Sequence, residues 1–286
     1  MHCIKTLCQR KLQSMNERRF NYSRNLPVFC AAILSLLAAS PGFAEPTPQA
    51  IAAFNQRIAA VEQRLTRQHQ APDSFLAVPG SDPKAPTKLR QGELIIEQLA
   101  SPAEPELPGA LLHHWRGTAF APKATAADFE RLLRDFNGYP QRFAPEVLDA
   151  KVLTQHDNHL TAKMRVRQKH ILTVVMDTTY DVTFGRLDSR DAYSISRSTQ
   201  IREIDAPGTP HERALGPTED HGFLWRLNSY WTYEERDGGL YIQIESVSLS
   251  RSIPTGLGWA IGPFVELVPR ESLEFTLHSA CNAIRK

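Results

Sequence analysis

The sequence predicts an α+β fold in which a curved antiparallel sheet wraps around a long C-terminal helix. Residues 223–251 hold two long runs of alternating residues joined by Asp237-Gly238, the strongest short-range signal of a β-hairpin. Residues 256–285 then place apolar residues at three- and four-residue spacing, which is typical of a helix with one buried face. Because long strands need a large apolar partner, we expect this helix to pack across the sheet and to leave a cavity between them.

The hairpin turn fixes the pairing of its two strands. A type I′ turn requires positive φ at both central residues, and with Asp237 and Gly238 there, Tyr230 lies opposite Glu245. Successive side chains point to opposite faces of a strand, so each face of the hairpin carries its own set of residues. One set is Trp225, Leu227, Ser229, Trp231, Tyr233, Ile242, Ile244, Ser246 and Ser248. The other set is Arg226, Asn228, Tyr230, Thr232, Gln243, Glu245, Val247, Leu249 and Arg251.

The first 44 residues have the pattern of a secretory signal peptide. A basic leader precedes an apolar run over residues 28–39, and Gly42-Phe43-Ala44 follows with small residues suited to cleavage after Ala44. The apolar run is shorter than the ~20 residues that a membrane-spanning helix needs. Met15 would give the leader a more conventional start. We therefore expect a signal peptide over 1–44, an N-terminal helix and linker over 45–109, one domain over 110–286, and a secreted or periplasmic location.

The charge balance and the cysteine count argue against nucleic-acid binding and against a disulfide framework. The chain has 33 Lys and Arg and 31 Asp and Glu, but six of these basic residues and one acidic residue lie in the leader. The remaining chain is net acidic, which removes the electrostatic support for binding nucleic acid. Of the four cysteines only Cys281 lies beyond residue 44, so the expected mature chain cannot form an internal disulfide.

Hydrophobic periodicity predicts the other elements in order. In the N-terminal part, a helix is predicted over 46–70 and a strand over 92–99, with loops over 71–87 and 101–109. In the main domain, Thr125 and Asp128 form a capping box that starts a helix. Further strands are predicted over 110–122, 147–155, 159–169, 171–184 and 192–204, and a loop over 205–220. Pro269 should kink or restart the C-terminal helix.

This order of strand, helix, about six antiparallel strands and a C-terminal helix resembles the helix-grip fold of the START and polyketide-cyclase-like superfamily. The resemblance covers residues 110–285 and is carried by FERLLRDFNGYPQRFAPEVLDAKVL at 129–153 and SRSIPTGLGWAIGPFVELVPRESLEFTL at 250–277. It implies a cavity between sheet and helix that binds a lipid, sterol, quinone or polyketide. A minority of the superfamily are enzymes, and it has no universal catalytic residue to assign here.

Candidate ligand-binding residues come from both faces of the hairpin and from the helices. If the polar face lines the cavity, Tyr230 and Glu245 are cross-strand neighbours with Cβ atoms ~5 Å apart, and could orient a polar head group or transfer a proton. If that face is instead solvated, the face with Trp225 and Trp231 lines the cavity. Both arrangements give an apolar cavity with a few polar contacts. The candidates are Leu133, Trp225, Arg226, Asn228, Tyr230, Trp231, Glu245, Arg251, Trp259 and Phe264.

Other patterns predict no further chemistry. A basic stripe could touch anionic lipid or nucleic acid, although a solvated strand face is the simpler interpretation; it comprises Lys163, Arg165, Arg167 and Lys169. The two histidine pairs, His113 with His114 and His156 with His159, have no third ligand that would complete a metal site. Nucleophile, phosphate-binding and dinucleotide motifs are absent from the sequence. We therefore predict no catalytic residue, no metal and no cofactor.

The sequence thus predicts a protein outside the cytoplasm that binds or carries a hydrophobic small molecule, lipid or isoprenoid-like, without catalysing a reaction. Tyr230, Glu245 and Arg251 would orient this ligand. One alternative is a cyclase-type enzyme that uses Tyr230 and Glu245 for proton transfer, and another is an envelope interaction module whose N-terminal helix recruits a partner. Transient contact with a membrane is compatible with the first interpretation, no nucleic-acid partner is expected, and the oligomeric state is not predicted.

Overall fold

The computed structural model describes residues 45–77, 83–99, 107–169, 173–252 and 258–285, and it describes no side chain for Asp73 or for residues 258–266. All described residues belong to one compact unit. The predicted signal peptide and its cleavage site lie outside the described residues, as does most of the predicted linker at 101–109.

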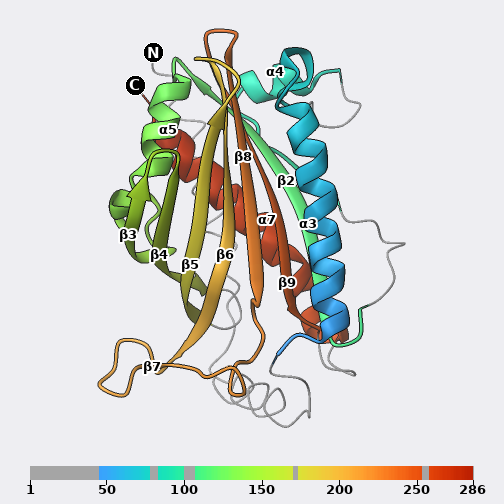
Figure 1. Ribbon diagram of the computed structural model, residues 1–286, viewed down its shortest axis with the longest axis vertical. Coiled ribbons are helices and arrows are strands. Elements are labelled where there is room, and N and C mark those ends of the chain that lie inside the picture. Colours follow the sequence, from blue (N-terminus) through green and yellow to red (C-terminus); the bar gives the residue numbers. More distant parts are fainter. Residues whose placement is uncertain (1–44, 78–82, 100–106, 170–172, 253–257, 286) are drawn as a thin grey trace, which may run out of the picture. The chain divides into compact units, whose positions relative to one another are not determined.

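An antiparallel sheet of nine strands forms the centre of this unit (Figure 1). The strands are β1 (Ile95–Gln98), β2 (Ala110–Pro122), β3 (Val147–His156), β4 (His159–Lys169), β5 (Thr173–Arg186), β6 (Asp191–Asp205), β7 (Arg213–Ala214), β8 (Arg226–Arg236) and β9 (Gly239–Arg251). Their order is β1-β2-β9-β8-β6-β5-β4-β3, and the short β7 pairs only with β6. The first long strand and the last therefore lie side by side, although most of the domain separates them in the sequence.

The β8–β9 hairpin has the predicted turn and register. Asp237 and Gly238 have φ values of 56° and 75°, as a type I′ turn requires. Tyr230 pairs with Glu245, and Trp231 pairs with Ile244. The turn residues and strand alternation therefore predicted correctly which side chains share a face of this hairpin.

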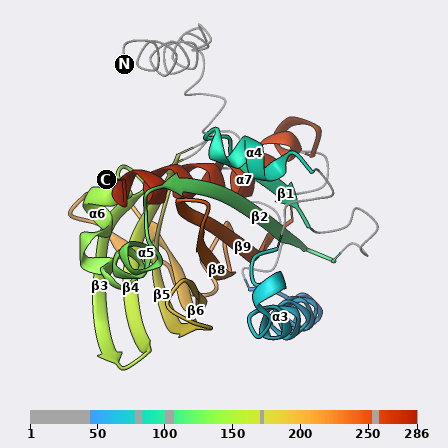
Figure 2. The ribbon, with the colours of Figure 1, turned by 90° about the horizontal axis from the view of Figure 1, so that it is seen from above.

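Helices cover both sides of the sheet (Figure 2). The C-terminal helix α7 (Gly258–Ala283) lies across the concave side, where α5 (Ala126–Arg134) and the short α6 (Tyr139–Arg142) close one end. The N-terminal helix α3 (Pro48–Gln68) lies on the opposite side, and a short helix, α4 (Ala85–Arg90), follows it. This confirms the predicted α+β helix-grip architecture. Every helix in the described part of the chain is too short or too polar to span a bilayer.

The C-terminal helix packs its second half against the sheet through the predicted apolar stripe. Leu273, Leu277, Ala280 and Ile284 are all buried in the main core, and Cys281 packs partly buried beside them. Pro269 lies inside α7, which runs through it as one helix rather than as the two pieces that the sequence predicted. The stripe before Pro269 falls mostly on side chains outside the described residues.

Gly117 of β2 allows α7 to approach the sheet closely. A Cβ atom at this position would lie 2.7 Å from Cδ1 of Leu277, which is fully buried. We therefore expect Gly117→Ala to lower the free energy of unfolding by about 1–3 kcal/mol, because the packed core must move to admit the methyl group. Urea denaturation at neutral pH measures this change. The matched control is Gly216→Ala, whose added Cβ would meet only Oε2 of Glu219, at 3.3 Å, a contact that this exposed side chain can relieve by a small movement. Equal effects of the two substitutions would contradict the packing argument.

The N-terminal segment contributes to the sheet and to its outer face. Thr47 caps α3 by accepting a hydrogen bond from the Ala50 backbone, and Phe54, Val61 and Leu65 are buried on the side of the helix that faces the sheet. The predicted strand at 92–99 is β1, which extends the sheet by pairing with β2. Helix α4 was not predicted, since its first half was assigned to the Pro-rich loop over 71–87 and residues 88–90 to no element.

Candidate ligand-binding cavity

A cavity of about 450 Å³ lies between the concave side of the sheet and α7. The residues that line it come from α5 and the following turns, from β3, β4, β5, β6, β8 and β9, and from the middle of α7. The apolar ones are Leu133, Phe136, Tyr139, Phe143, Val147, Met164, Val166, Met176, Tyr180, Val182, Leu224, Leu227, Trp231, Ile244 and Phe275. Ligand sites are typically concave, mostly apolar and of ~300–1,000 Å³, so this cavity has the size and lining of a small-molecule site.

Stacked aromatic rings make up one wall of the cavity. Phe136 stacks on Tyr139 with ring centroids 4.5 Å apart, and Tyr139 contacts Phe143 at 4.8 Å. The Tyr139 hydroxyl donates to the carbonyl of Leu133 at 3.1 Å, which satisfies the only polar atom of this side chain. Burial raises the pKa of Tyr139, so the phenol stays neutral. The wall therefore presents ring faces and no charge.

The charged residues of the lining mark the side of the cavity that is open to solvent. Lys169 and Glu271 are exposed, whereas Glu146 and Arg167 are partly exposed. At this side, Gln168 Nε2 of β4 donates to Ser272 Oγ of α7 at 3.2 Å, which joins the end of this strand to the helix. A ligand with an apolar body would thus meet charge only at the entrance.

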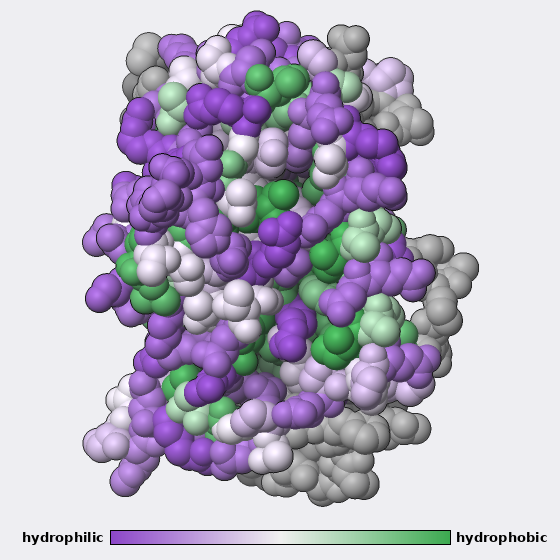
Figure 3. Space-filling model, viewed as in Figure 1, coloured by the Kyte–Doolittle hydropathy of each residue, from purple (hydrophilic) through white to green (hydrophobic). Residues whose placement is uncertain are grey.

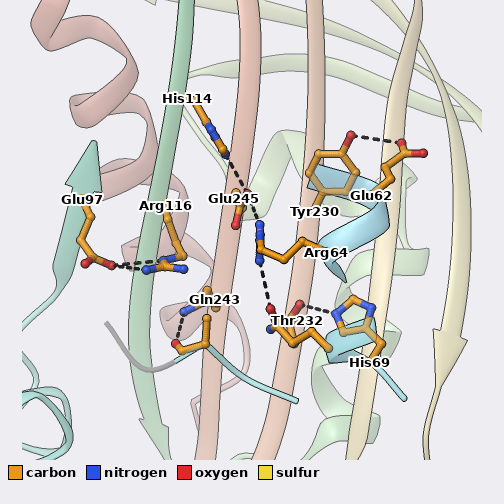
Figure 4. Close-up of polar contacts among 12 residues, drawn as sticks. Glu62, Arg64, His69, Glu97, His114, Arg116, Tyr230, Thr232, Gln243 and Glu245 are labelled. Carbon is orange, nitrogen blue, oxygen red and sulfur yellow. Dashed lines mark hydrogen bonds and ion pairs between the residues drawn. The ribbon is translucent and has the colours of Figure 1, made fainter. Parts of the chain in front are cut away.

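The opposite face of the hairpin carries a buried polar network beneath α3 (Figure 4). Glu245 is 2% exposed, and its Oε1 accepts a hydrogen bond from His114 Nε2 of β2 at 2.7 Å. Arg64 reaches from α3 to the same carboxylate and also donates to Gln68 at 3.0 Å. Burial by itself would raise the pKa of Glu245, but the hydrogen bond from His114 and the charge of Arg64 outweigh it and lower that pKa. Glu245 is therefore a buried carboxylate that anchors α3.

A second group of contacts joins the same helix to β6 and β8. The Tyr230 hydroxyl donates to Glu62 Oε1 at 3.1 Å, and Arg197 donates to the same oxygen at 2.7 Å. Around them, Phe54 and Val61 of α3 form an apolar cluster with Leu249 and other residues of the sheet. In the view of Figure 1 the surface is mainly hydrophilic, with hydrophobic residues in small separate patches (Figure 3). The apolar stripe of α3 is therefore used within the fold.

The structure brings together only part of the predicted site. Leu133 and Trp231 line the cavity, whereas Asn228, Tyr230 and Glu245 lie beneath α3 on the other face of the sheet. Neither of the two predicted arrangements is correct in full: the face with Trp231 lines the cavity, but the polar face is covered by a helix rather than solvated. Trp259 and Phe264 belong to α7, and their side chains lie outside the described residues.

Three further candidates lie away from the cavity. Trp225 precedes β8, so strand alternation does not hold there, and its side chain packs in the cluster beneath α3. Trp225 and Arg226 line a separate hollow of about 390 Å³ together with Asp220. Arg251 ends β9 and is partly exposed, and its backbone N–H donates to the Gly222 carbonyl at 2.8 Å. The placement of Trp225 on the cavity wall was wrong.

These positions remove the geometric basis of the proton-transfer alternative. Tyr230 and Glu245 are cross-strand neighbours, as predicted, but each is bonded to a residue of α3 and neither faces the cavity. A substrate in the cavity would be separated from both by the sheet itself. We therefore assign them to the docking of α3.

Comparison with known proteins gives structural likeness only. No protein-family model and no curated protein sequence matches the chain. A fragment of a STAR-related lipid transfer protein from Xanthomonas axonopodis is 19% identical, with a TM-score of 0.42 over 67% of this chain and 99% of that chain. Human STARD10 is 9% identical, with a TM-score of 0.39 over 65% and 72% of the two chains. The Zhui aromatase/cyclase of a Streptomyces species is 14% identical, with a TM-score of 0.37 over 61% and 92%. At TM-scores below 0.5, these similarities give no basis for assigning a ligand or an activity to this chain.

Most residues of the cavity wall were missed because they lie outside the hairpin, on other strands, on the turns after α5 and on α7. Met164 and Val166 belong to a strand with clean apolar alternation, and Phe136 lies at the end of the predicted helix stripe. The sequence therefore showed that these elements have apolar faces, but it did not show that those faces line the same cavity as Trp231. The register of β4 with β5 and of β6 with β8 makes that connection.

Local contacts hold the first half of the basic stripe and one histidine of each pair, whereas Arg167 and Lys169 lie at the open side of the cavity. Asp177 binds both Lys163 and Arg165, and Arg165 also binds Glu212 at 2.5 Å. His159 bonds Asp181 at 2.7 Å, and His114 bonds Glu245. Among the residues that the structure describes, no cluster of His, Cys, Asp and Glu has the composition to hold a metal ion.

Acid should weaken the docking of α3 through His69. This ring is buried, bonds Thr232 at 2.9 Å and stacks on Tyr193 with centroids 4.2 Å apart. Burial and the charge of Arg64 lower its pKa from 6.5 to about 4, with Glu245 acting in the opposite sense. Between these values the unfolded chain binds the proton and the folded chain does not, so stability is full above pH 6.5 and falls as the pH drops toward 4.

We expect the loss of unfolding free energy between pH 7 and pH 4.5 to be roughly 2–3 kcal/mol larger in the wild type than in His69→Gln. Urea denaturation at the two pH values measures it. His156, whose side chain is 88% exposed, provides the control, and His156→Gln should leave the pH dependence unchanged. Identical pH dependence in the wild type and His69→Gln would contradict the assignment.

Proposed function

We propose that the protein binds a hydrophobic small molecule, a lipid or an isoprenoid-like compound, in the cavity between the sheet and α7. The single observation that supports this proposal is the cavity itself: about 450 Å³ of space with aromatic and aliphatic walls and with charged residues only on the open side. An apolar core normally fills such space with side chains, because empty volume costs stability.

Burial of apolar surface would supply the affinity. Each buried methylene contributes about 0.8 kcal/mol and immobilising the ligand costs at least about 4 kcal/mol, so a hydrocarbon body of about fifteen methylenes is needed for micromolar affinity. Shape and apolar contact therefore carry recognition, and α3 and its polar network keep the other face of the sheet closed.

Native mass spectrometry of the purified protein tests this proposal. A non-covalently bound apolar compound should accompany the protein and be removed by extraction with organic solvent, after which the protein should take up the apolar fluorophore N-phenyl-1-naphthylamine with one-to-one stoichiometry. Protein that neither carries such a compound nor takes up the fluorophore would contradict the proposal.

We further propose that the protein acts outside the cytoplasm. The support is the leader of residues 1–44, with its apolar run and small residues before Glu45. Expression of the full chain in a Gram-negative host, followed by osmotic release of the periplasm, should yield a form whose N-terminal residue is Glu45. A protein retained in the cytoplasm with residues 1–44 attached would refute this location.

A further inference from the structure

Three serine hydroxyls on the cavity wall have no hydrogen-bond partner among the described residues. Ser194, Ser196 and Ser229 all line the cavity, and Ser194 is only 2% exposed. By contrast, the Thr178 hydroxyl on the same wall donates to the Met164 carbonyl at 3.1 Å. The Ser198 hydroxyl, next but one along β6, accepts a hydrogen bond from the Leu227 backbone at 2.9 Å. The protein therefore satisfies the neighbouring hydroxyls and leaves these three directed at the cavity.

Strand pairing brings the three hydroxyls into one cluster. Ser196 of β6 pairs directly with Ser229 of β8, and Ser194 pairs with Trp231. Direct cross-strand partners have Cβ atoms about 5 Å apart, and Ser194 and Ser196 point to the same face about 7 Å apart, because side chains alternate along a strand. One ligand group can therefore reach more than one of these hydroxyls at the same time.

The surroundings of the cluster select the kind of group that fits it. A hydroxyl both donates and accepts, and a buried hydroxyl without a partner is destabilising. The charged lining residues, Glu146, Arg167, Lys169 and Glu271, are all at least partly exposed, so none of them is buried beside the serines to neutralise a ligand charge. A carboxylate or an ammonium here would be a buried, unpaired charge, whereas a hydroxyl, ketone or ester oxygen would complete the hydrogen bonding at no such cost.

We propose that Ser194, Ser196 and Ser229 form the polar recognition point of the cavity and orient a ligand that has an apolar body and an uncharged, oxygen-bearing group. This inference rests on the proposed function, since it requires a ligand in the cavity. It adds the chemical class of that ligand: an alcohol, ketone or ester rather than an anionic or cationic amphiphile.

Displacement of N-phenyl-1-naphthylamine by dodecanol, dodecane and sodium dodecanoate tests the inference. The wild type should bind dodecanol more tightly than dodecane and more tightly than dodecanoate. In the double variant Ser196→Ala/Ser229→Ala, the affinity for dodecanol should fall roughly three- to tenfold, the loss of one to two net hydrogen bonds, while the affinity for dodecane stays equal or rises. Ser198→Ala is the matched control, because its hydroxyl is already bonded within the fold, and it should leave the preference for dodecanol unchanged.

The possible results separate this inference from the proposed function. The inference is overturned if all three compounds bind without preference, or if the double variant loses affinity for dodecanol and dodecane alike. In either case the serine cluster does not recognise the ligand, while the proposed binding of a hydrophobic molecule in the cavity stands. If dodecanoate binds most tightly, the class of ligand is wrong. If neither the fluorophore nor any of the compounds binds, both the inference and the proposed function fail. Thermal unfolding of the double variant, expected at or above the wild-type midpoint, shows that the two substitutions leave the fold intact. Ser198→Ala removes a hydrogen bond of the fold, so its midpoint should fall slightly while its unfolding stays cooperative.

Discussion

Glu245→Gln is expected to lower the free energy of unfolding by about 3 kcal/mol and to leave ligand binding within about twofold of the wild type. The carboxylate is almost fully buried and accepts hydrogen bonds from both His114 and Arg64. A neutral amide at this position removes the negative charge to which the imidazole and the guanidinium donate. Ligand binding is retained because this side chain faces α3 and not the cavity. Urea denaturation and titration with N-phenyl-1-naphthylamine measure the two effects.

The control for this experiment is an exposed ion pair of the same chemistry. Glu219 binds Arg213 at 2.7 Å, with both side chains about half exposed, at 48% and 50%. Glu219→Gln should therefore lower stability far less than Glu245→Gln does, as is usual for exposed pairs. The reverse pattern for Glu245→Gln, with stability unchanged and binding lost, would return Glu245 to the ligand site and overturn its assignment to helix docking.

Met164→Trp is expected to reduce binding of N-phenyl-1-naphthylamine at least tenfold. Met164 lines the cavity and is only partly buried, so the larger indole should extend into the free space. The cost in stability should stay within about 1–3 kcal/mol, the usual range for an enlarged side chain, because the cavity accepts most of the added volume. Fluorescence titration gives the affinity, and urea denaturation shows that the variant is folded.

Lys163→Trp provides the matched control on the adjacent residue. Its side chain is 49% exposed and points away from the cavity, where it pairs with Asp177. The same substitution there should leave the affinity unchanged and cost less than about 1 kcal/mol for the lost surface pair. Equal loss of binding in both variants would mean that the fluorophore binds elsewhere or that the tryptophan acts through stability.

Local signals predicted most of the fold. Asp237-Gly238 determined the hairpin and its register, the Thr125–Asp128 capping box started α5, and the apolar stripe around Leu277 placed the buried side of the last helix. Each of these features depends on residues close together in the chain. Helix α7 does not restart at Pro269, because it runs through this residue as one helix.

The candidate site depended on contacts between distant residues, and there the sequence was insufficient. Alternation separated the two faces of the hairpin but could not say which one faces the cavity. The answer depends on α3, whose Arg64 contacts Glu245 across 181 positions of sequence. The face with Tyr230, Glu245 and Val247 is therefore neither a ligand site nor a solvated surface, but the surface on which α3 packs.

Methyl-detected NMR tests most directly whether the ligand enters the cavity rather than the interface with α3. The protein, with labelled Ile, Leu, Val and Met methyl groups, is titrated with N-phenyl-1-naphthylamine. Met164, Met176 and Ile244, which line the cavity, should change their resonances, whereas Val247 and Leu249 beneath α3 should stay where they are. Changes confined to Val247 and Leu249, or no change at any methyl group, would contradict the cavity as the binding site.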